Sequence, residues 1–387
     1  MKIKKIEAFV LTNQMKEAFY FSQWTYNERR ICIVKVTSDD GTTGWGEGYG
    51  PAEIIKTGIN HIAPMLIGEN PLENEILWHK MYRKTLDFAR RGVLVASISA
   101  IDVALWDLKG KALNQPVSVL MGGQHRKKVV PYATGLYFSK SDNLTEKLVK
   151  EAKTYVKKGF KAVKMKVGLS VSQDIGMVKA IREAIGADVK LMIDSNHAYS
   201  LREATLLARA IEKYDIGWFE EPVSPEYYRQ YRELRAKTTI PIAGGECEYL
   251  RYGFQTLIEN DCVDILQVDI CGAGGLSEAK RISTLANTRG IEIVPHVWGT
   301  GIAFNAALHF ISNLEPIPGR FYPSDMYVEY DRSENKIREM LTSPSIKMQD
   351  GYVNIPQGPG LGIEVDENVV REFSSDCLLY TSDAADE

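Results

Sequence analysis

Residues 160–168 read FKAVKMKVG, an apolar run of strand length that carries lysines at alternate positions. Alternate residues of a strand share one face, so Lys164 and Lys166 point the same way and the apolar residues between them point the other way. Two ammonium groups this close together repel each other and are costly to bury. The face they share is therefore either bathed by water, as on an edge strand, or turned toward something anionic.

Apolar runs of strand length recur between residues 129 and 330, and stretches with a helical pattern separate them. The other runs read VVPYATG, VKLMIDSN, IGWFEEP, IPIAGGE, VDILQVDI, IEIVPHVWG and, less regularly, FYPSDMYVEY. Parallel strands that are covered on both faces read as nearly continuous apolar runs separated by helices. About eight such units predict an α/β barrel.

Charged groups close these runs at intervals of 23 to 28 residues after Lys166. In sequence order they are Asp194, Glu220, Glu246, Asp269 and His296. One strand, one helix and two loops make a unit of about this length, so each charged group returns at the same level of successive strands. In a barrel that level is the C-terminal mouth, where active sites lie. This regular phase favours an inward, functional face for the two lysines over a solvated edge.

The residues before 126 predict a small α+β domain. Residues 3–11 and 30–37 are β-rich, DDG at 39–41 supplies a turn, and TGWGEG at 43–48 follows as a return strand. VASISAIDVALWDLKGKAL at 95–113 predicts an amphipathic helix. We therefore divide the protein into a capping domain (1–125), a barrel domain (126–350), a C-terminal segment that returns to the capping domain (351–373) and a non-native tail (374–387).

Composition indicates a soluble globular protein. Of the 387 residues, 44% are hydrophobic and 25% are charged, and the net charge of -3 gives no footprint for nucleic acid or for an anionic membrane. The sequence has no apolar stretch long enough for a signal peptide or a membrane span, so we expect a cytoplasmic protein. The five cysteines show no CxxC spacing and are expected to be free thiols without a catalytic role.

Three carboxylates, Asp194, Glu220 and Glu246, end consecutive runs and should meet in the predicted mouth. Carboxylates that lie together raise one another's pKa unless a cation neutralises them. A ligand set made only of oxygen selects a hard metal, with Mg²⁺ first and Mn²⁺ as the alternative. The competing interpretation is that these carboxylates pair with arginines at the end of the barrel.

Basic groups are predicted on both flanks of this metal. Repulsion from Lys164 should depress the pKa of Lys166 toward neutrality and make Lys166 a base, while Lys164 stays charged and holds a carboxylate oxygen of the substrate. On the other flank, Asp269 should accept a hydrogen bond from His296, which makes the imidazole a second base or acid. The residues alone do not decide whether Lys166 or His296 takes the proton.

A metal with a base beside it suits removal of a proton α to a carboxylate, because metal and ammonium groups stabilise the resulting enediolate. Glu329, in YVEYDRSEN, could donate a hydrogen bond to that enediolate if it is protonated, or could pair with Arg332 instead. His197 follows Asn196 and is expected to point away from the metal as a structural residue.

The protein resembles the mandelate racemase subgroup of the enolase superfamily over residues 1–373. The resemblance rests on SAIDVALWDLKGKALNQPVSVLMGG, KMK, MIDSNHAY, WFEEP, GGE, LQVDICGAGG, VPHVWGTG and VEYDRSEN. It implies a (β/α)7β modified TIM barrel with an α+β capping domain built from both termini, whose loop at 19–30 closes over the substrate. It also implies Mg²⁺ ligands at Asp194, Glu220 and Glu246, with Lys166 and the His296/Asp269 dyad as the two bases.

Within this subgroup the motifs are most similar to cycloisomerases that open the ring of a galactarolactone. We therefore expect a small-molecule acid sugar or its lactone as substrate, and a homo-oligomer. An acid-sugar dehydratase and an epimerase or racemase use the same enolate step and stay as alternatives, and an inactive sugar-acid binding protein is the non-enzymatic rival. The residues expected to bind the substrate are Lys164, Asn196, Trp298 and Tyr26.

Overall fold

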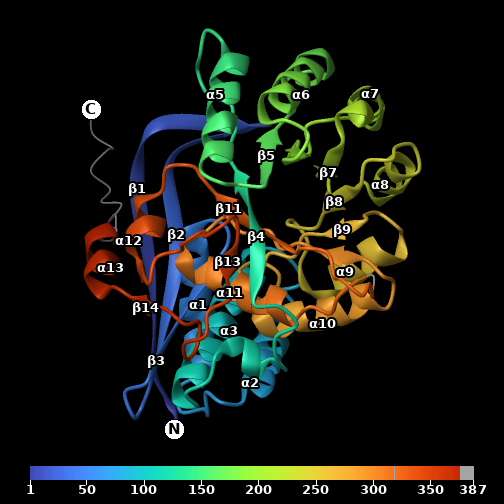
Figure 1. The fold of residues 1–387 in the computed structure, drawn as a ribbon. Helices are drawn as coiled ribbons and strands as arrows, with labels where there is room; N and C mark the ends of the chain where they lie inside the picture. Colours follow the sequence, from blue (N-terminus) through green and yellow to red (C-terminus); the bar gives the residue numbers. More distant parts are fainter. Residues whose placement is uncertain (318, 375–387) are drawn as a thin grey trace, which may run out of the picture.

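The computed structural model of the protein describes residues 1–317 and 319–374 (Figure 1). The non-native tail was predicted at 374–387, and all of it after residue 374 lies outside the described residues. Of the five cysteines, the four that lie within the described residues are free thiols, as predicted. Among the described residues, no helix combines the length and the apolar character that a membrane crossing requires.

The predicted apolar runs form parallel strands of one curled sheet, in the order β10-β9-β8-β7-β6-β5-β4-β11. These strands are β4 (Lys128–Thr134), β5 (Ala162–Lys166), β6 (Lys190–Asp194), β7 (Ile216–Glu220), β8 (Ile242–Gly244), β9 (Ile265–Leu266), β10 (Glu292–Ile293) and β11 (Tyr327–Asp331). The helices between them are α5 (Leu144–Lys157), α6 (Val171–Ile185), α7 (Leu201–Ile211), α8 (Tyr228–Arg235), α9 (Leu250–Glu259), α10 (Gly275–Asn287) and α11 (Gly301–Asn313). This alternation confirms the (β/α)7β barrel.

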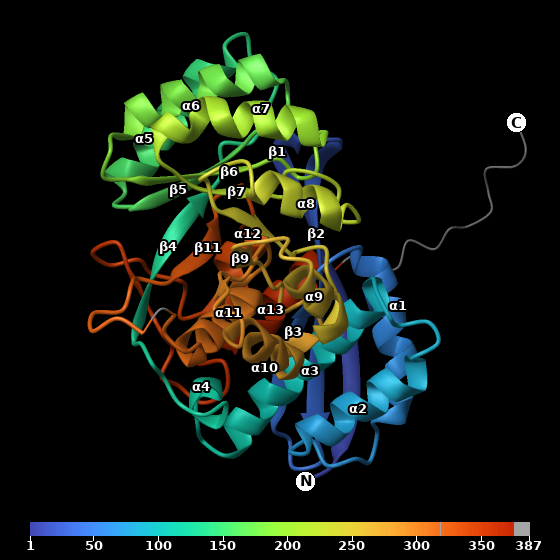
Figure 2. The ribbon, with the colours of Figure 1, turned by 90° about the vertical axis from the view of Figure 1, so that its right-hand side faces the viewer.

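The interior of the barrel holds an apolar layer to which strands β4 to β9 and the residue directly after β10 each contribute. Its members are Tyr132, Ala162, Met192, Trp218, Ala243, Ile265 and Val294. Because the side-chain period of a strand is two, the face that carries Ala162 continues with Lys164 and Lys166. The lysines therefore stand above this apolar layer, inside the barrel, and not on a solvated edge. In Figure 2, helices α5 to α8 lie outside strands β5 to β7.

The N-terminal domain begins with the antiparallel sheet β1 (Ile3–Phe21), β2 (Trp24–Ser38) and β3 (Thr43–Gly48). Helices α1 (Ala52–Ile62), α2 (Asn74–Thr85), α3 (Val93–Ala112) and α4 (Val117–Leu120) follow it. The glycines of TGWGEG let α3 lie directly on β3, since a Cβ added to Gly46 would come within 1.9 Å of the Ala100 carbonyl oxygen. The predicted helix is thus present, but the prediction that it is amphipathic is wrong. It is buried on nearly every side because β3 covers one face and α10 another.

The C-terminal segment returns to the N-terminal domain, as the family resemblance implies. The segment contains β13 (Val353–Asn354), β14 (Glu364–Val365) and α13 (Glu367–Phe373), and it is preceded by α12 (Lys336–Met340) and β12 (Thr342–Ser343). Helices α12 and α13 contact β1, and Figure 1 shows them in red beside that blue strand. The capping domain is therefore built from both ends of the protein. We propose domain boundaries after residues 125 and 350.

The stretch 19–30 is a β-hairpin and not the loop that the family resemblance implies. Strand β1 continues to Phe21 and strand β2 begins at Trp24, with these two residues paired across the turn. The stretch is rich in aromatic residues, which favour strands because they pack well on a pleated surface. The mouth of the barrel is thus covered by a paired ribbon.

Candidate active site

The register of the sheet brings the predicted site residues to one level. Lys166 of β5 is paired with Asp194 of β6, and Asp194 is paired with Glu220 of β7. Each of the predicted catalytic and metal-binding side chains exposes 9% or less of its surface: Lys164, Lys166, Asp194, Glu220, Glu246, Asp269, His296 and Glu329. The structure therefore gathers all of them at the C-terminal mouth of the barrel.

Asp194 lies between the two lysines. Its Oδ2 is 2.5 Å from the Nζ of Lys166 and 3.5 Å from the Nζ of Lys164. The Lys166 ammonium also donates to Oδ1 of Asn196 at 2.7 Å. Burial tends to raise the pKa of Asp194, but the two lysines outweigh it and hold that pKa below its usual range. The two lysines thus share one carboxylate oxygen of Asp194.

Lys164 lies deeper than Lys166 and is bound by the protein's own carboxylates. Its Nζ is 2.5 Å from Oε1 of Glu220 and 2.9 Å from Oε1 of Glu329. Burial tends to lower the pKa of Lys164, but Glu220 and Glu329 raise it well above its usual value. Lys164 is therefore a fixed positive charge under the mouth, and its predicted contact with the substrate stays a prediction.

The carboxylates of the mouth suit a hard divalent cation. Burial, followed by the charge of Asp194, raises the pKa of Glu220 to about 8. Burial and the neighbouring Glu246 likewise raise the pKa of Glu221 well above its usual value. A raised pKa of a buried carboxyl group indicates that the positive charge around it is too small to stabilise its ionised form, and a bound cation would supply that charge. Mg²⁺ is suitable because it prefers ligands that are all oxygen. The residues present thus fit the predicted metal.

Asp269 and His296 form the predicted dyad on the other side of these carboxylates. The His296 Nδ1 is 2.6 Å from Oδ2 of Asp269, and its Nε2 is 3.4 Å from Oε2 of Glu246. Burial tends to lower the pKa of His296, but Glu246 and the hydrogen bond with Asp269 raise it to about 10. These two carboxylates therefore favour a protonated imidazole, and the Nε2 of that imidazole faces the mouth.

Glu329 is an acceptor and not the predicted protonated donor. Its Oε1 accepts from the Thr134 hydroxyl at 2.6 Å, and its Oε2 accepts from the Val297 backbone N–H at 3.0 Å. Burial tends to raise the pKa of Glu329, but Lys164 and His296 outweigh it and lower the pKa. The predicted pairing with Arg332 is also replaced, because the ion pairs of Glu329 in the described residues are with Lys164 and His296.

The hairpin of β1 and β2 covers the mouth with aromatic rings. The Phe21 ring lies 4.6 Å from the Nζ of Lys166, and the Tyr26 ring lies 4.9 Å from that of Trp298. A cavity of about 550 Å³ opens here, and Tyr26, Trp298 and Asp269 are among the residues that line it. The structure therefore places the predicted substrate-binding residues Tyr26 and Trp298 at one cavity, and Asn196 at Lys166.

Arg29 belongs to this cavity although the sequence analysis did not select it. Its guanidinium lies over the Trp298 ring at 3.5 Å and pairs with Asp331 through Nη2 at 3.1 Å. Its Nη1 is buried, with no hydrogen-bond partner among the residues that the structure describes. The strand period could have indicated it, because Arg29 shares a face with the buried Ile31 and Ile33.

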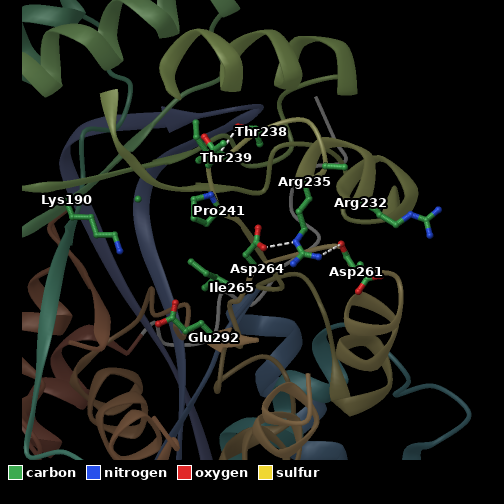
Figure 3. A pocket seen from close by; sticks show the side chains of 13 residues that line it. Lys190, Arg232, Arg235, Thr238, Thr239, Pro241, Asp261, Asp264, Ile265 and Glu292 are labelled. Atoms are coloured by element: carbon green, nitrogen blue, oxygen red, sulfur yellow. Dashed lines mark hydrogen bonds and ion pairs between the residues drawn. The ribbon is translucent and has the colours of Figure 1, made fainter. Parts of the chain in front are cut away.

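A second cavity, of about 600 Å³, lies at the opposite end of the barrel (Figure 3). Lys190, Asp264 and Glu292 line it, and they stand at or next to the amino ends of β6, β9 and β10. The acidic group of Asp264 is already held by Arg235, whose Nε is 2.7 Å away. None of the predicted site residues lines this cavity, so the C-terminal mouth is the candidate active site.

Comparisons with known proteins identify the family. The family described as mandelate racemase / muconate lactonizing enzyme, N-terminal domain, matches residues 5–122, and the enolase C-terminal domain-like family matches residues 147–369. D-galactarolactone cycloisomerase of Agrobacterium fabrum is 40% identical over 96% of this protein and 99% of its own length. Arabinonate dehydratase of Saccharolobus solfataricus is 35% identical, with the same coverage.

A solved structure is more similar in sequence than these relatives. The crystal structure of the 3,6-anhydro-D-galactonate cycloisomerase from Zobellia galactanivorans is 53% identical, with a TM-score of 0.89. The similarity covers 97% of the present protein and all of that one. The whole architecture, capping domain and barrel together, is therefore shared.

Proposed function

The protein belongs to the mandelate racemase/muconate lactonizing enzyme family, a family of enzymes in the enolase superfamily, and we propose that it opens the ring of a cyclic acid sugar. In the proposed reaction a base removes the proton α to the carboxylate, and the ring oxygen then leaves the β carbon. The observation that carries the proposal is the placement of Lys166 and the His296/Asp269 dyad on two sides of one buried carboxylate set.

Two relatives suggest substrates with one feature in common. In 3,6-anhydro-D-galactonate the ring oxygen is an ether on C3, which is β to the carboxylate at C1. In a 1,4-lactone of galactaric acid the ring oxygen is an ester on the carbon β to the free carboxylate. Both rings therefore open by the same α-proton removal and β-elimination, and each gives a 3-deoxy-2-keto acid. The higher identity of the first relative favours the anhydro acid, with the aldarolactone second.

Lys166 is the proposed base. Asp194 and Asn196 fix its Nζ from two directions, at 2.5 Å and 2.7 Å, so its position at the mouth is well defined, and it would act as the base in its neutral amine form. Lys164 lies beneath it as a permanent charge bound to Glu220 and Glu329, where it offsets the negative charge of the buried carboxylates. In this arrangement Lys166 is the lysine that meets the substrate.

His296 is the proposed acid. Asp269 fixes its Nδ1, and the acidic surroundings of Nε2 favour the protonated form that a proton donor needs. An ether oxygen leaves as an alkoxide and requires such a proton, whereas an ester oxygen leaves as a carboxylate and requires much less help. A protonated His296 therefore suits the anhydro acid better than it suits the lactone.

Asp194, Glu220 and Glu246 are the proposed Mg²⁺ ligands, and the ion, when bound, would stabilise negative charge that develops on the substrate carboxylate. Arg29 lines the cavity, and its buried Nη1, which has no hydrogen-bond partner among the described residues, would bind another oxygen of the substrate. Tyr26 and Trp298 supply flat apolar surfaces beside it, where the carbon face of a sugar ring can lie. Together these residues would orient the ring between base and acid.

The alternative activity, dehydration of a linear acid sugar, is supported by the arabinonate dehydratase relative. It would use the same base and would need His296 as the ether ring does, since hydroxide, like an alkoxide, is a poor leaving group. An epimerase or racemase would return a proton to the same carbon. An inactive binding protein has no need for two opposed proton-transfer groups.

A substrate comparison tests the proposal. The Mg²⁺-loaded protein is incubated separately with 3,6-anhydro-D-galactonate, D-galactaro-1,4-lactone and linear D-galactonate, and products are identified by ¹³C NMR. We expect 3-deoxy-2-keto acids from the cyclic compounds and no reaction of D-galactonate. If D-galactonate loses water while the two cyclic compounds do not react, the protein is a dehydratase instead. If none of the three compounds reacts, the result favours the binding protein.

A histidine substitution tests the acid. His296→Asn should slow opening of the ether ring by about 10²-fold or more and slow opening of the lactone much less. His309→Asn makes the same change at a buried histidine on α11, outside the mouth, and should leave both rates close to wild type. Equal losses for the two rings in His296→Asn would contradict the assignment of His296 as the acid.

A further inference from the structure

A cluster with different chemistry lies beside the proposed Mg²⁺ ligands. His197, Glu221 and Cys247 come from the segments that follow β6, β7 and β8. Glu221 and Cys247 directly follow Glu220 and Glu246 in the sequence. The His197 Nε2 is 3.2 Å from Oε2 of Glu221 and 3.7 Å from Sγ of Cys247, and all three potential ligand atoms lie within 4.8 Å of one another.

We propose that His197, Glu221 and Cys247 form a second cation site, which takes a borderline divalent ion such as Zn²⁺. Zinc bonds of about 2.3 Å to sulfur and about 2.0–2.2 Å to nitrogen and oxygen, at tetrahedral angles, place ligand atoms about 3.3–3.6 Å apart. The two contacts of the His197 Nε2 are close to these separations. The third pair, Glu221 and Cys247, is also within 4.8 Å, so the three side chains can close around an ion.

The donor atoms distinguish this site from the first one. Imidazole nitrogen and thiolate sulfur prefer Zn²⁺ and similar ions, whereas Mg²⁺ prefers oxygen. Access is also available, because the His197 side chain is 20% exposed and Cys247 is half-buried, while Glu221 is enclosed at 1%. Three protein ligands would leave a fourth position for water.

The second site is connected to the proposed base through a single amide. Oε2 of Glu221 faces His197 and is also 3.5 Å from Nδ2 of Asn196, whose Oδ1 accepts from Lys166 at 2.7 Å. An ion bound to Glu221 would compete with Asn196 for that oxygen. Occupation of the second site should therefore slow proton abstraction, a consequence that rests on the proposed role of Lys166.

Cobalt is a visible probe of the site. The Mg²⁺-saturated protein is titrated with Co²⁺, and the sulfur-to-cobalt charge-transfer band in the near ultraviolet is recorded. We expect the band to reach its maximum at one Co²⁺ ion per protein molecule. Added Zn²⁺ should abolish the band because it displaces the Co²⁺. The band should disappear in Cys247→Ser and weaken in His197→Gln, with an affinity loss of about tenfold or more.

Two control variants separate the sites. Cys262→Ser removes a buried thiol elsewhere and should leave the cobalt band unchanged, and Asp194→Asn weakens the proposed Mg²⁺ site but should also leave it unchanged. The proposal is wrong if Mg²⁺-saturated wild type gives no band, or if Cys247→Ser gives the wild-type band. Either result would indicate that the cluster is held by hydrogen bonds alone.

Inhibition tests the connection separately from binding. Zn²⁺ should inhibit wild type and Cys262→Ser at the concentration that displaces cobalt, and should inhibit Cys247→Ser about tenfold less strongly. If the cobalt band behaves as expected but Zn²⁺ inhibits Cys247→Ser equally, the site stands and its link to Lys166 is refuted.

Discussion

At the scale of single residues, the two lysines of FKAVKMKVG have different surroundings although they differ by two positions. The strand period predicts that both share one face, and the regular spacing of the later charged groups predicts that this face points into the barrel; the structure confirms both. Sequence alone could not reveal that Asp194 lies between them or that Glu329 pairs with Lys164, because both contacts come from other strands. The predicted influence of Lys164 on Lys166 stays a prediction.

Arg29 should control substrate binding. Arg29→Lys keeps a positive charge but removes the planar fork with its free Nη1, so we expect KM to rise about tenfold while kcat changes much less. Asp331 stays paired with Arg338 at 2.6 Å, which limits the effect on folding. Steady-state kinetics and a thermal melt measure the two effects, with Arg202→Lys at an exposed position of α7 as the matched control. An unchanged KM in folded Arg29→Lys would remove Arg29 from the substrate site.

His309 should make the protein less stable in acid. Burial lowers its pKa from the usual 6.5 to about 4 in the folded state. Between these two values the unfolded state binds a proton that the folded state lacks, so His309 lowers the free energy of unfolding as the pH falls from 6.5 to 4. The total effect is about 3 kcal/mol.

Denaturant unfolding measures this effect. The Nδ1 of His309 accepts from the Ser118 backbone N–H at 3.1 Å, and the Asn side chain of His309→Asn can accept in its place. The drop in unfolding free energy between about pH 7 and about pH 4.5 should be smaller by about 2 to 3 kcal/mol in His309→Asn than in wild type. Parallel pH profiles for the two proteins would contradict the assignment.

At the scale of elements, the short strands β8, β9 and β10 set the limit of prediction. Each contains only two or three residues, so sequence period could not give their bounds. The spacing of polar groups nevertheless located Glu246, Asp269 and His296, because repeated βα units of similar length return each strand end to the mouth. The hairpin at 19–30 was missed because its pairing depends on tertiary packing against Trp298 and Tyr137.

The hairpin should shield the proton-transfer site from water. Phe21→Ala removes the ring that lies over the Nζ of Lys166, so we expect kcat/KM to fall about tenfold with little change in the melting temperature. Gln23→Ala, at the exposed tip of the same hairpin, is the control and should behave as wild type. Equal activity of the two variants would mean that the hairpin does not act as a cover.

At the scale of the whole molecule, sequence predicted the barrel, the capping domain and the cluster at the mouth, but not how the two domains join. Helix α3 was expected to expose one face, and instead it is packed between β3 and α10. The joint is polar: Asp102 accepts from the Ser277 hydroxyl at 2.6 Å, and that hydroxyl accepts from Nε1 of Trp106 at 2.9 Å. Such partners lie far apart in the sequence and leave no local pattern.

This joint should make the two domains unfold together. Ser277→Ala leaves Asp102 and Trp106 each short of a buried partner, so we expect a loss of about 2 kcal/mol in unfolding free energy within a single transition. Denaturant unfolding gives the loss, and hydrogen exchange of β2 and β6 reports the two domains. If hydrogen exchange in Ser277→Ala becomes faster in β2 but not in β6, the two domains do not unfold in one common transition.

The central claim is that Lys166 removes the α-proton and His296 protonates the leaving oxygen. The most direct measurement is the rate at which the C2 proton signal of 3,6-anhydro-D-galactonate disappears in D₂O with Mg²⁺ present. We predict that wild type loses the signal and opens the ring, that His296→Asn exchanges the proton without opening the ring, and that Lys166→Ala does neither, with a loss of about 10²–10⁴-fold. Exchange at the wild-type rate in Lys166→Ala, or an intact C2 proton with wild type, would contradict the account.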